Sequence, residues 1–280
     1  MRDIRTIIDI EQDPGLHRRP IVQQITKINT SFSIPKYHWV PDKVDKRDHI
    51  YNLVGATQSA IVDLRLYCSP IEDQGNLGSC TGNAIAGSIE LIDKRNSRTL
   101  DVSRLFIYYY ERLLEGSINY DSGAYIRDGI KACYTYGAPV ESLWPYNISK
   151  FRTPPTAAAI TDAAKRKVTS YQRAIDYNAV MDALNSGYSV VVGFSVYSSF
   201  ESVAVARTGN MPYPNTKKEK LLGGHAVLIV GYNKNRNVFI VRNSWGAGWG
   251  DRGYFYMPFQ VIQNTSMSSD FWIIKSINNP

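Results

Sequence analysis

Apolar positions follow a helical period in the first half of the chain and a strand-like pattern in the second half. Ile85, Ile89 and Ile92 recur at intervals of four and three residues, which places them on one face of a helix. We therefore predict a long buried helix over about residues 80–95. Two more helices are predicted: 103–114, capped by Ser103, and 125–136, ended by Gly137.

Short apolar runs separated by turn residues predict strands in the second half. They fall at 165–175, 188–196, 225–232, 237–242, 253–257 and 271–277, with a helix at 177–186. Helices followed by strands indicate an α+β fold in two lobes. We expect a helical lobe and a strand lobe.

Residues 1–60 differ from the rest of the chain. They contain several prolines and no long apolar period, so we interpret them as an N-terminal extension that is mostly extended. Residues 61–280 would form the folded domain. We place its helical lobe at about 61–160 and its β lobe at about 161–280.

Four residues from three separate stretches of the sequence carry candidate chemistry. Cys80 would begin the first helix, whose positive end favours a thiolate. The imidazole of His225 could take the thiol proton, and the amide of Asn243 could orient that ring. The side-chain amide of Gln74, together with the backbone N–H of Cys80, could donate to an oxyanion.

Taken singly, each residue has a plain structural explanation. A cysteine before an apolar helix is commonly a small buried hydrophobe, and an Asn-Ser-Trp sequence is commonly just a turn. A histidine before the run Val-Leu-Ile-Val is commonly a satisfied residue of a strand. Taken together, the order, spacing and flanking residues favour a cysteine nucleophile with its base.

In these motifs, about residues 60–280 resemble the papain family of cysteine peptidases. The stretches that carry the resemblance are 62–65, 74–80, 223–231 and 243–254. Residues 37–48 are similar to the lead-in of microbial and viral members. Thr81 stands where the family usually has Trp, and Leu77 stands where secreted members carry a disulfide cysteine.

The resemblance implies a helical lobe and an antiparallel β-barrel-like lobe with the active-site cleft between them. It also implies a cysteine endopeptidase that acts through an acyl-enzyme thioester on polypeptide substrates, without a cofactor. It places Gly123 and Ala124 against the substrate backbone and Gly224 in the subsite for the residue two before the cut. Trp245 would shield the Asn–His contact. No histidine lies between the first helix and Gly123, so the paired-histidine loop that makes cathepsin B a dipeptidase is absent.

Two alternatives use the same scaffold. A thiol acyltransferase or peptide ligase would share these catalytic residues, and product analysis with an added amine would separate it from a hydrolase. A non-catalytic binding relative would be favoured if Cys80, His225, Asn243 or Gln74 were replaced, and none of them is.

The resemblance also suggests self-inhibition, because the family makes zymogens whose leader lies along the cleft. We expect residues within about 1–35 to cover Cys80, and residues 37–48 to stay with the mature body. The alternative is an ordered arm that staples the two lobes without gating the site.

Composition adds limits rather than a function. The net charge of +7 allows polyanion binding, but we prefer a solvated basic surface because no nucleic-acid module is visible. Three cysteines and no Cys/His cluster argue against a metal site. Acidic and basic residues interrupt the N-terminus, and no apolar run is long enough to span a membrane. We therefore expect a soluble enzyme, intracellular or virion-associated rather than secreted.

Overall fold

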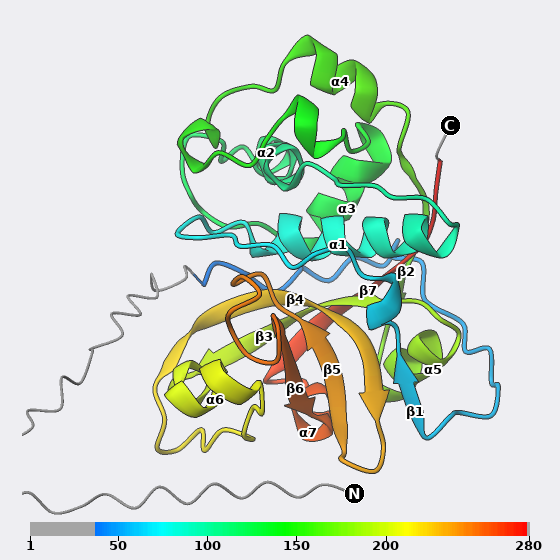
Figure 1. The fold of residues 1–280 in the computed structure, drawn as a ribbon, viewed down its shortest axis with the longest axis vertical. Coiled ribbons are helices and arrows are strands. Elements are labelled where there is room, and N and C mark those ends of the chain that lie inside the picture. The colour runs from blue at the N-terminus through cyan, green and yellow to red at the C-terminus, as the bar shows by residue number, and fades with distance from the viewer. Residues whose placement is uncertain (1–36, 279–280) are drawn as a thin grey trace, which may run out of the picture. The chain divides into compact units, whose positions relative to one another are not determined.

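Helix α1 (Cys80–Arg95) separates a group of helices from a sheet in the computed structural model, which describes residues 37–278 (Figure 1). The group contains α2 (Arg104–Leu114), α3 (Ile126–Thr135) and α4 (Ala157–Ala163). These helices form the helical lobe expected from the sequence.

The ends of these helices follow from single residues. The Ser103 hydroxyl accepts the N–H of Phe106 and so caps α2 at its start. Gly137 follows α3 with a φ of +86°, and a Cβ there would collide with the carbonyl of Ala163. Only glycine fits this turn without strain.

The second half of the chain forms an antiparallel sheet with the strand order β2-β7-β3-β4-β5-β6, and β1 pairs with β4. The strands are β1 (Ile61–Asp63), β2 (Val168–Ala174), β3 (Val190–Tyr197), β4 (Leu221–Asn233), β5 (Val238–Arg242), β6 (Tyr254–Pro258) and β7 (Ser268–Ile277). The α+β fold in two lobes is confirmed. The pairings among the described strands run along an open path and do not close into a barrel.

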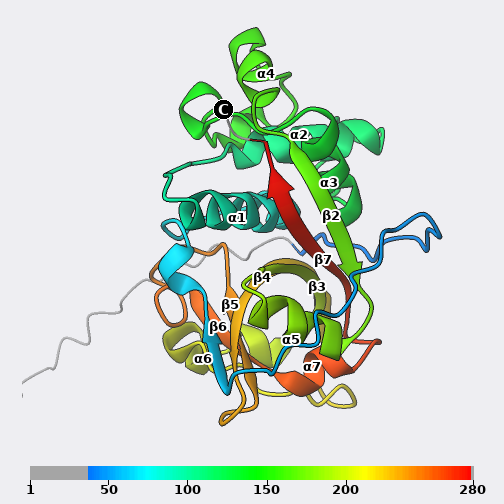
Figure 2. The ribbon, with the colours of Figure 1, turned by 90° about the vertical axis from the view of Figure 1, so that its right-hand side faces the viewer.

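Three short helices accompany the sheet: α5 (Tyr177–Asn185), α6 (Val203–Thr208) and α7 (Phe259–Gln263). One apolar core lies between them and the sheet, and a second lies between the sheet and helices α1 and α3. Strands β2 and β7 extend beside α3, so the sheet reaches into the helical lobe (Figure 2). The start of α1 therefore lies over β4, where the two lobes meet.

Candidate active site

Cys80 is the first residue of α1 and is fully buried. Burial raises the pKa of its thiol to about 11, because a thiolate there would lose its hydration. Backbone groups of Ala226, Thr81 and His38 lie beside the sulfur and offset part of this effect. The sulfur is thus adjacent to Ala226, the residue that follows His225, and its thiol is neutral near pH 7 in this state.

His225 lies in β4 with its ring held by Asn243. The distance from Nε2 to the Asn243 Oδ1 is 2.9 Å, and the same oxygen accepts the backbone N–H of Ser244. Because that oxygen accepts twice, Nε2 is assigned the ring proton and Nδ1 the lone pair. Nδ1 is buried and has no hydrogen-bond partner among the described residues.

Two further contacts complete the surroundings of His225. Trp245 stacks on the imidazole, with ring centroids 5.1 Å apart and planes inclined by 23°. Burial lowers the pKa of His225 to about 4, and the bond to Asn243 raises it only in part. Imidazole and thiol are therefore both neutral in the buried state.

Gln74 is connected to the same group through Ser244. Its Oε1 accepts the Ser244 hydroxyl at 2.6 Å, and its backbone N–H donates to the Ser244 carbonyl at 2.8 Å. Its Nε2 donates to the carbonyl of Leu77 at 3.0 Å, which leaves the second amide hydrogen of that nitrogen for another acceptor. Sequence reasoning did not identify Ser244, although its place beside Asn243 was a signal.

A segment from the N-terminal side of the chain lies on this site. We call residues 37–39 the cover. A Cβ at Gly123 would collide with the carbonyl of His38, and a Cβ at Gly78 would collide with its imidazole. The backbone of His38 also lies beside the thiol of Cys80. The cover therefore occupies the cleft at the residue expected to hold the substrate backbone.

The two other cover residues extend along the cleft in opposite directions. Trp39 donates its backbone N–H to the carbonyl of Gly224 at 2.9 Å, and its indole lies against Gly193, where a Cβ would collide with it. Tyr37 lies on the other side, with its ring centroid 5.9 Å from that of His225 and 6.0 Å from that of Trp245.

The cover lies just after the segment in which a cover of Cys80 was expected. Residues 37–48 were expected to stay on the mature body, and a cover was expected within 1–35. Residues 1–36 lie outside the described part of the chain, whereas residues 37–39 lie directly on the site. Gly193 offered a signal for this contact, because a glycine inside an apolar strand often marks a close approach of another segment.

A cluster of buried charges holds the chain just after the cover. We call residues 42–48 the anchor. Asp48 forms ion pairs with Arg127 of α3 at 2.7 Å and with Arg173 of β2 at 3.0 Å. Asp42 accepts the indole N–H of Trp272 at 2.7 Å and donates its own backbone N–H to Asp270 at 2.8 Å. The anchor is thereby bonded to both lobes.

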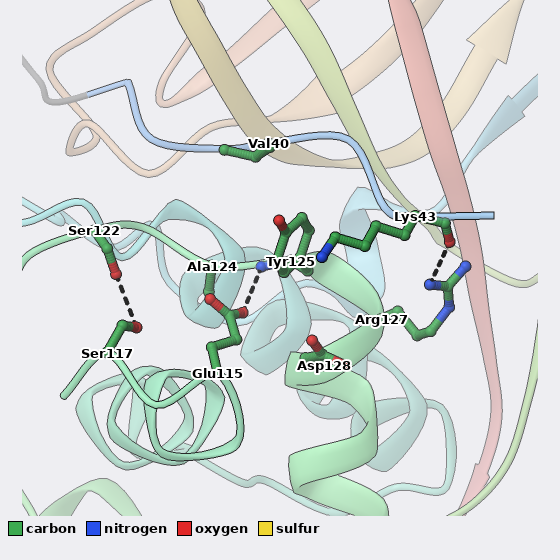
Figure 3. A pocket seen from close by; sticks show the side chains of 9 residues that line it. All are labelled: Val40, Lys43, Glu115, Ser117, Ser122, Ala124, Tyr125, Arg127 and Asp128. Atoms are coloured by element: carbon green, nitrogen blue, oxygen red, sulfur yellow. Dashed lines mark hydrogen bonds between the residues drawn. The ribbon is translucent and has the colours of Figure 1, made fainter. Parts of the chain in front are cut away.

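A pocket of about 470 Å³ opens beside the anchor (Figure 3). Val40 and Lys43 form one side, and Ala124, two residues before α3, forms part of the other. Burial raises the pKa of Glu115 in this pocket to about 7, although its carboxylate accepts the N–H of Tyr125. The pocket lies next to the cover in the chain, because Val40 directly follows Trp39.

Metal-binding clusters and membrane-spanning helices are absent from the described residues. Within 37–278, no group of three or more His, Cys, Asp or Glu side chains is arranged to hold a metal ion. No described helix has the length and apolar character that crossing a membrane requires. Cys68, Cys80 and Cys133 are all free thiols and all buried.

The chain is similar in sequence to known proteins. Residues 59–274 match the model of the papain family cysteine proteases. An uncharacterized peptidase C1-like protein of Acanthamoeba polyphaga mimivirus is 44% identical over 220 residues, which cover 74% of this chain and 70% of the relative. Cysteine proteinase 3 of Entamoeba histolytica is 28% identical over 70% of this chain, which spans 61% of that relative.

A solved structure is similar over most of the chain. Xylellain, a cysteine protease from Xylella fastidiosa, superposes with a TM-score of 0.79 and 38% sequence identity. The match covers 86% of this chain and 96% of xylellain. The similarity thus includes both lobes.

Proposed function

Because the chain belongs to the papain family of cysteine proteases, we propose that it is an endopeptidase in which Cys80 is the nucleophile and His225 the base. Asn243 orients the imidazole. Gln74 and the backbone N–H of Cys80 donate to the oxyanion. The observation that carries this proposal is the pairing of His225 Nε2 with Asn243, which leaves Nδ1 as the ring nitrogen with a lone pair.

The reaction follows from these positions. Nδ1 of His225 takes the thiol proton, and the sulfur of Cys80 attacks the peptide carbonyl. The carbonyl oxygen becomes an oxyanion, to which the second hydrogen of Gln74 Nε2 donates. The imidazolium then gives its proton to the leaving amine. Water hydrolyses the thioester, with His225 again as the base, and the thiol is restored.

We also propose that the cover inhibits the enzyme. Cys80 and His225 are both fully buried beneath the chain, so no substrate reaches the sulfur in this state. The leaving amine of a substrate must lie beside His225, which protonates it, so a substrate runs from the Gly224 side toward Trp245. The cover runs the opposite way, from Tyr37 at Trp245 to Trp39 at Gly224. A reversed chain presents no peptide bond in the orientation that His225 can cleave.

In this proposal, residues 1–60 are an N-terminal extension that both blocks the active site (the gate) and links the two lobes (the staple). Residues 61–280 are the catalytic domain. The anchor at 42–48 is bonded to both lobes through buried carboxylates, which suits a staple. Removal of residues 1–35 alone would leave the cover in place. Activation therefore requires residues 37–39 to swing out or to be cut away from the anchor.

The test of the proposal is peptide cleavage by the full chain with a weakened cover, Tyr37→Ala with His38→Gly. We expect cleavage within peptides rather than removal of terminal dipeptides. Cys80→Ala should abolish it, and His225→Ala should be nearly as damaging, since the pair acts as a unit. Asn243→Ala should reduce the rate less, because Asn243 transfers no proton.

Product analysis separates the acyltransferase alternative from hydrolysis. An amine nucleophile is added at a concentration well below that of water, and the products are identified by mass spectrometry. Free acid as the main product supports the peptidase. Transfer to the amine as the main product, or cleavage that persists in Cys80→Ala, would contradict the proposal.

A further inference from the structure

The side chain of Tyr37 forms a hydrogen bond with a carboxylate that has no role in the proposed reaction. The Tyr37 hydroxyl donates to Oε1 of Glu201 at 2.6 Å. The exposed Glu201 is the last residue of a short 3-10 helix, Ser198–Glu201, that follows β3. Its neighbour Phe200 is buried against Trp245, with ring centroids 5.4 Å apart, so the backbone that carries Glu201 is packed beside Trp245.

The contacts of the Tyr37 ring lie on the side of the scissile bond that carries the leaving amine. The Tyr37 ring contacts His225 and Trp245 edge-on, and its Cβ lies over Gly223, where any side chain would collide with it. His225 must protonate the leaving amine, so the first residue after the cut lies against His225. Tyr37 therefore occupies the position that this substrate side chain takes once the cover has left.

We infer that Glu201 is a specificity-determining residue that selects tyrosine as the first residue after the cleaved bond. Trp245 and Gly223 accommodate the ring, and the Glu201 carboxylate accepts the hydroxyl. Phenylalanine fills the same space but leaves the carboxylate without that donor. A hydrogen bond to a charged acceptor at a partly exposed site should favour tyrosine over phenylalanine about fivefold in kcat/KM. This inference rests on the proposed peptidase function.

The test is a competition between two peptides that differ only in this residue, tyrosine or phenylalanine. The enzyme is the full chain with the weakened cover, Tyr37→Ala and His38→Gly, so that Tyr37 does not compete. We expect a Tyr:Phe ratio of about 5, a ratio near 1 in Glu201→Leu and an intermediate ratio in Glu201→Gln. The control Asp101→Asn, which removes a carboxylate from the helical lobe, should keep the ratio of the parent.

A ratio near 1 in the parent, or one that Glu201→Leu does not lower, would overturn the inference while leaving the peptidase proposal intact. Failure of the peptidase proposal looks different, since neither peptide would then be cut, or both would be cut by Cys80→Ala.

A second measurement does not depend on turnover. The rate of Cys80 alkylation in the full chain reports how tightly the cover is held. Tyr37→Phe and Glu201→Leu should each speed it about two- to tenfold, and the double variant should be no faster than either one. Additive effects of the two substitutions, or no effect of either, would overturn the assignment of Glu201.

Discussion

At the scale of single residues, the hydrogen bonds around Gln74 predict a large effect of this residue on kcat. Ser244 and Leu77 hold its amide in one orientation, with one Nε2 hydrogen left for the proposed bond to the oxyanion. Gln74→Ala should lower kcat by a factor of about 10²–10³, as expected for loss of one oxyanion donor. Steady-state kinetics in the weakened-cover background measures this, and an unchanged kcat would remove Gln74 from the mechanism.

Ser244 gives a related prediction, because its hydroxyl fixes the orientation of the Gln74 amide. Ser244→Ala should reduce kcat by less than Gln74→Ala, since the donor is still present but is held less firmly. The two substitutions together should cost no more than Gln74→Ala alone, because Ser244 acts through Gln74. A double variant much slower than Gln74→Ala would show that Ser244 has a separate role.

The four candidate catalytic residues could be named from sequence because each chemistry requires its residue type and the flanking motifs are distinctive. The cover could not be named in this way. Its contacts join residue 38 to Gly78 and Gly123, and residue 39 to Gly193 and Gly224, which lie far away in the chain. No local period encodes such contacts.

At the scale of elements, long helices and strands were predicted to within a few residues. The helix predicted at 80–95 is found at Cys80–Arg95, and that predicted at 103–114 is found at Arg104–Leu114. Their apolar stripes span several turns, and a cap marks the start of α2. Helices α6 and α7 and strand β1 were not predicted, because elements of three to six residues are too short to show a period.

Helices α1 and α2 meet through a buried carboxyl that explains a departure from the family pattern. Thr81 donates its hydroxyl to Glu111 at 2.7 Å, and Gly129 of α3 leaves room for that carboxyl group. Burial raises the pKa of Glu111 to about 8, so this carboxyl is protonated near pH 7. The small Thr81 thus joins α1 to α2 by a hydrogen bond, at a position where the family usually has a bulky Trp.

Glu111→Gln should therefore change how stability depends on pH. As pH rises from about 4.5 to about 8, the unfolded wild type loses a proton that the folded state retains, so the wild type loses stability and the variant does not. The melting temperature of the variant relative to wild type should rise by several degrees across this window and should stay constant above it. Each kcal/mol of stability corresponds to about 2–4 °C in melting temperature. A difference that does not change between pH 5 and pH 8 would contradict the assignment.

At the scale of the whole molecule, the anchor links the lead-in to both lobes. The side chains of Arg127 and Asp48 are only 7% and 8% exposed, whereas the nearby pair of Arg47 and Asp45 is open, with Arg47 86% exposed. Asp48→Asn should lower the free energy of unfolding by about 3–5 kcal/mol, because it leaves the buried guanidinium of Arg127 without its charged partner, whereas Arg173 keeps its ion pair with Asp270. Denaturant unfolding measures the loss.

Asp45→Asn is the matched control for the anchor, since it removes the same group from the same segment. Exposed pairs contribute little to stability, so this variant should unfold close to wild type. Equal losses in the two variants would show that the segment is stabilised by its charge in general and not by the buried pairs with Arg127 and Arg173.

The central claim is that a competent Cys80–His225 pair rests beneath the cover, and alkylation of Cys80 as a function of pH tests it most directly. In the full chain, burial holds the pKa of Cys80 at about 11, so a fraction of only about 10⁻⁴ is thiolate at pH 7 and labelling should be slow. Tyr37→Ala with His38→Gly should speed labelling at pH 7 at least about tenfold and move its midpoint to lower pH, with the label on Cys80. Equal rates in the two proteins, or label found mainly on Cys68 or Cys133, would contradict the account.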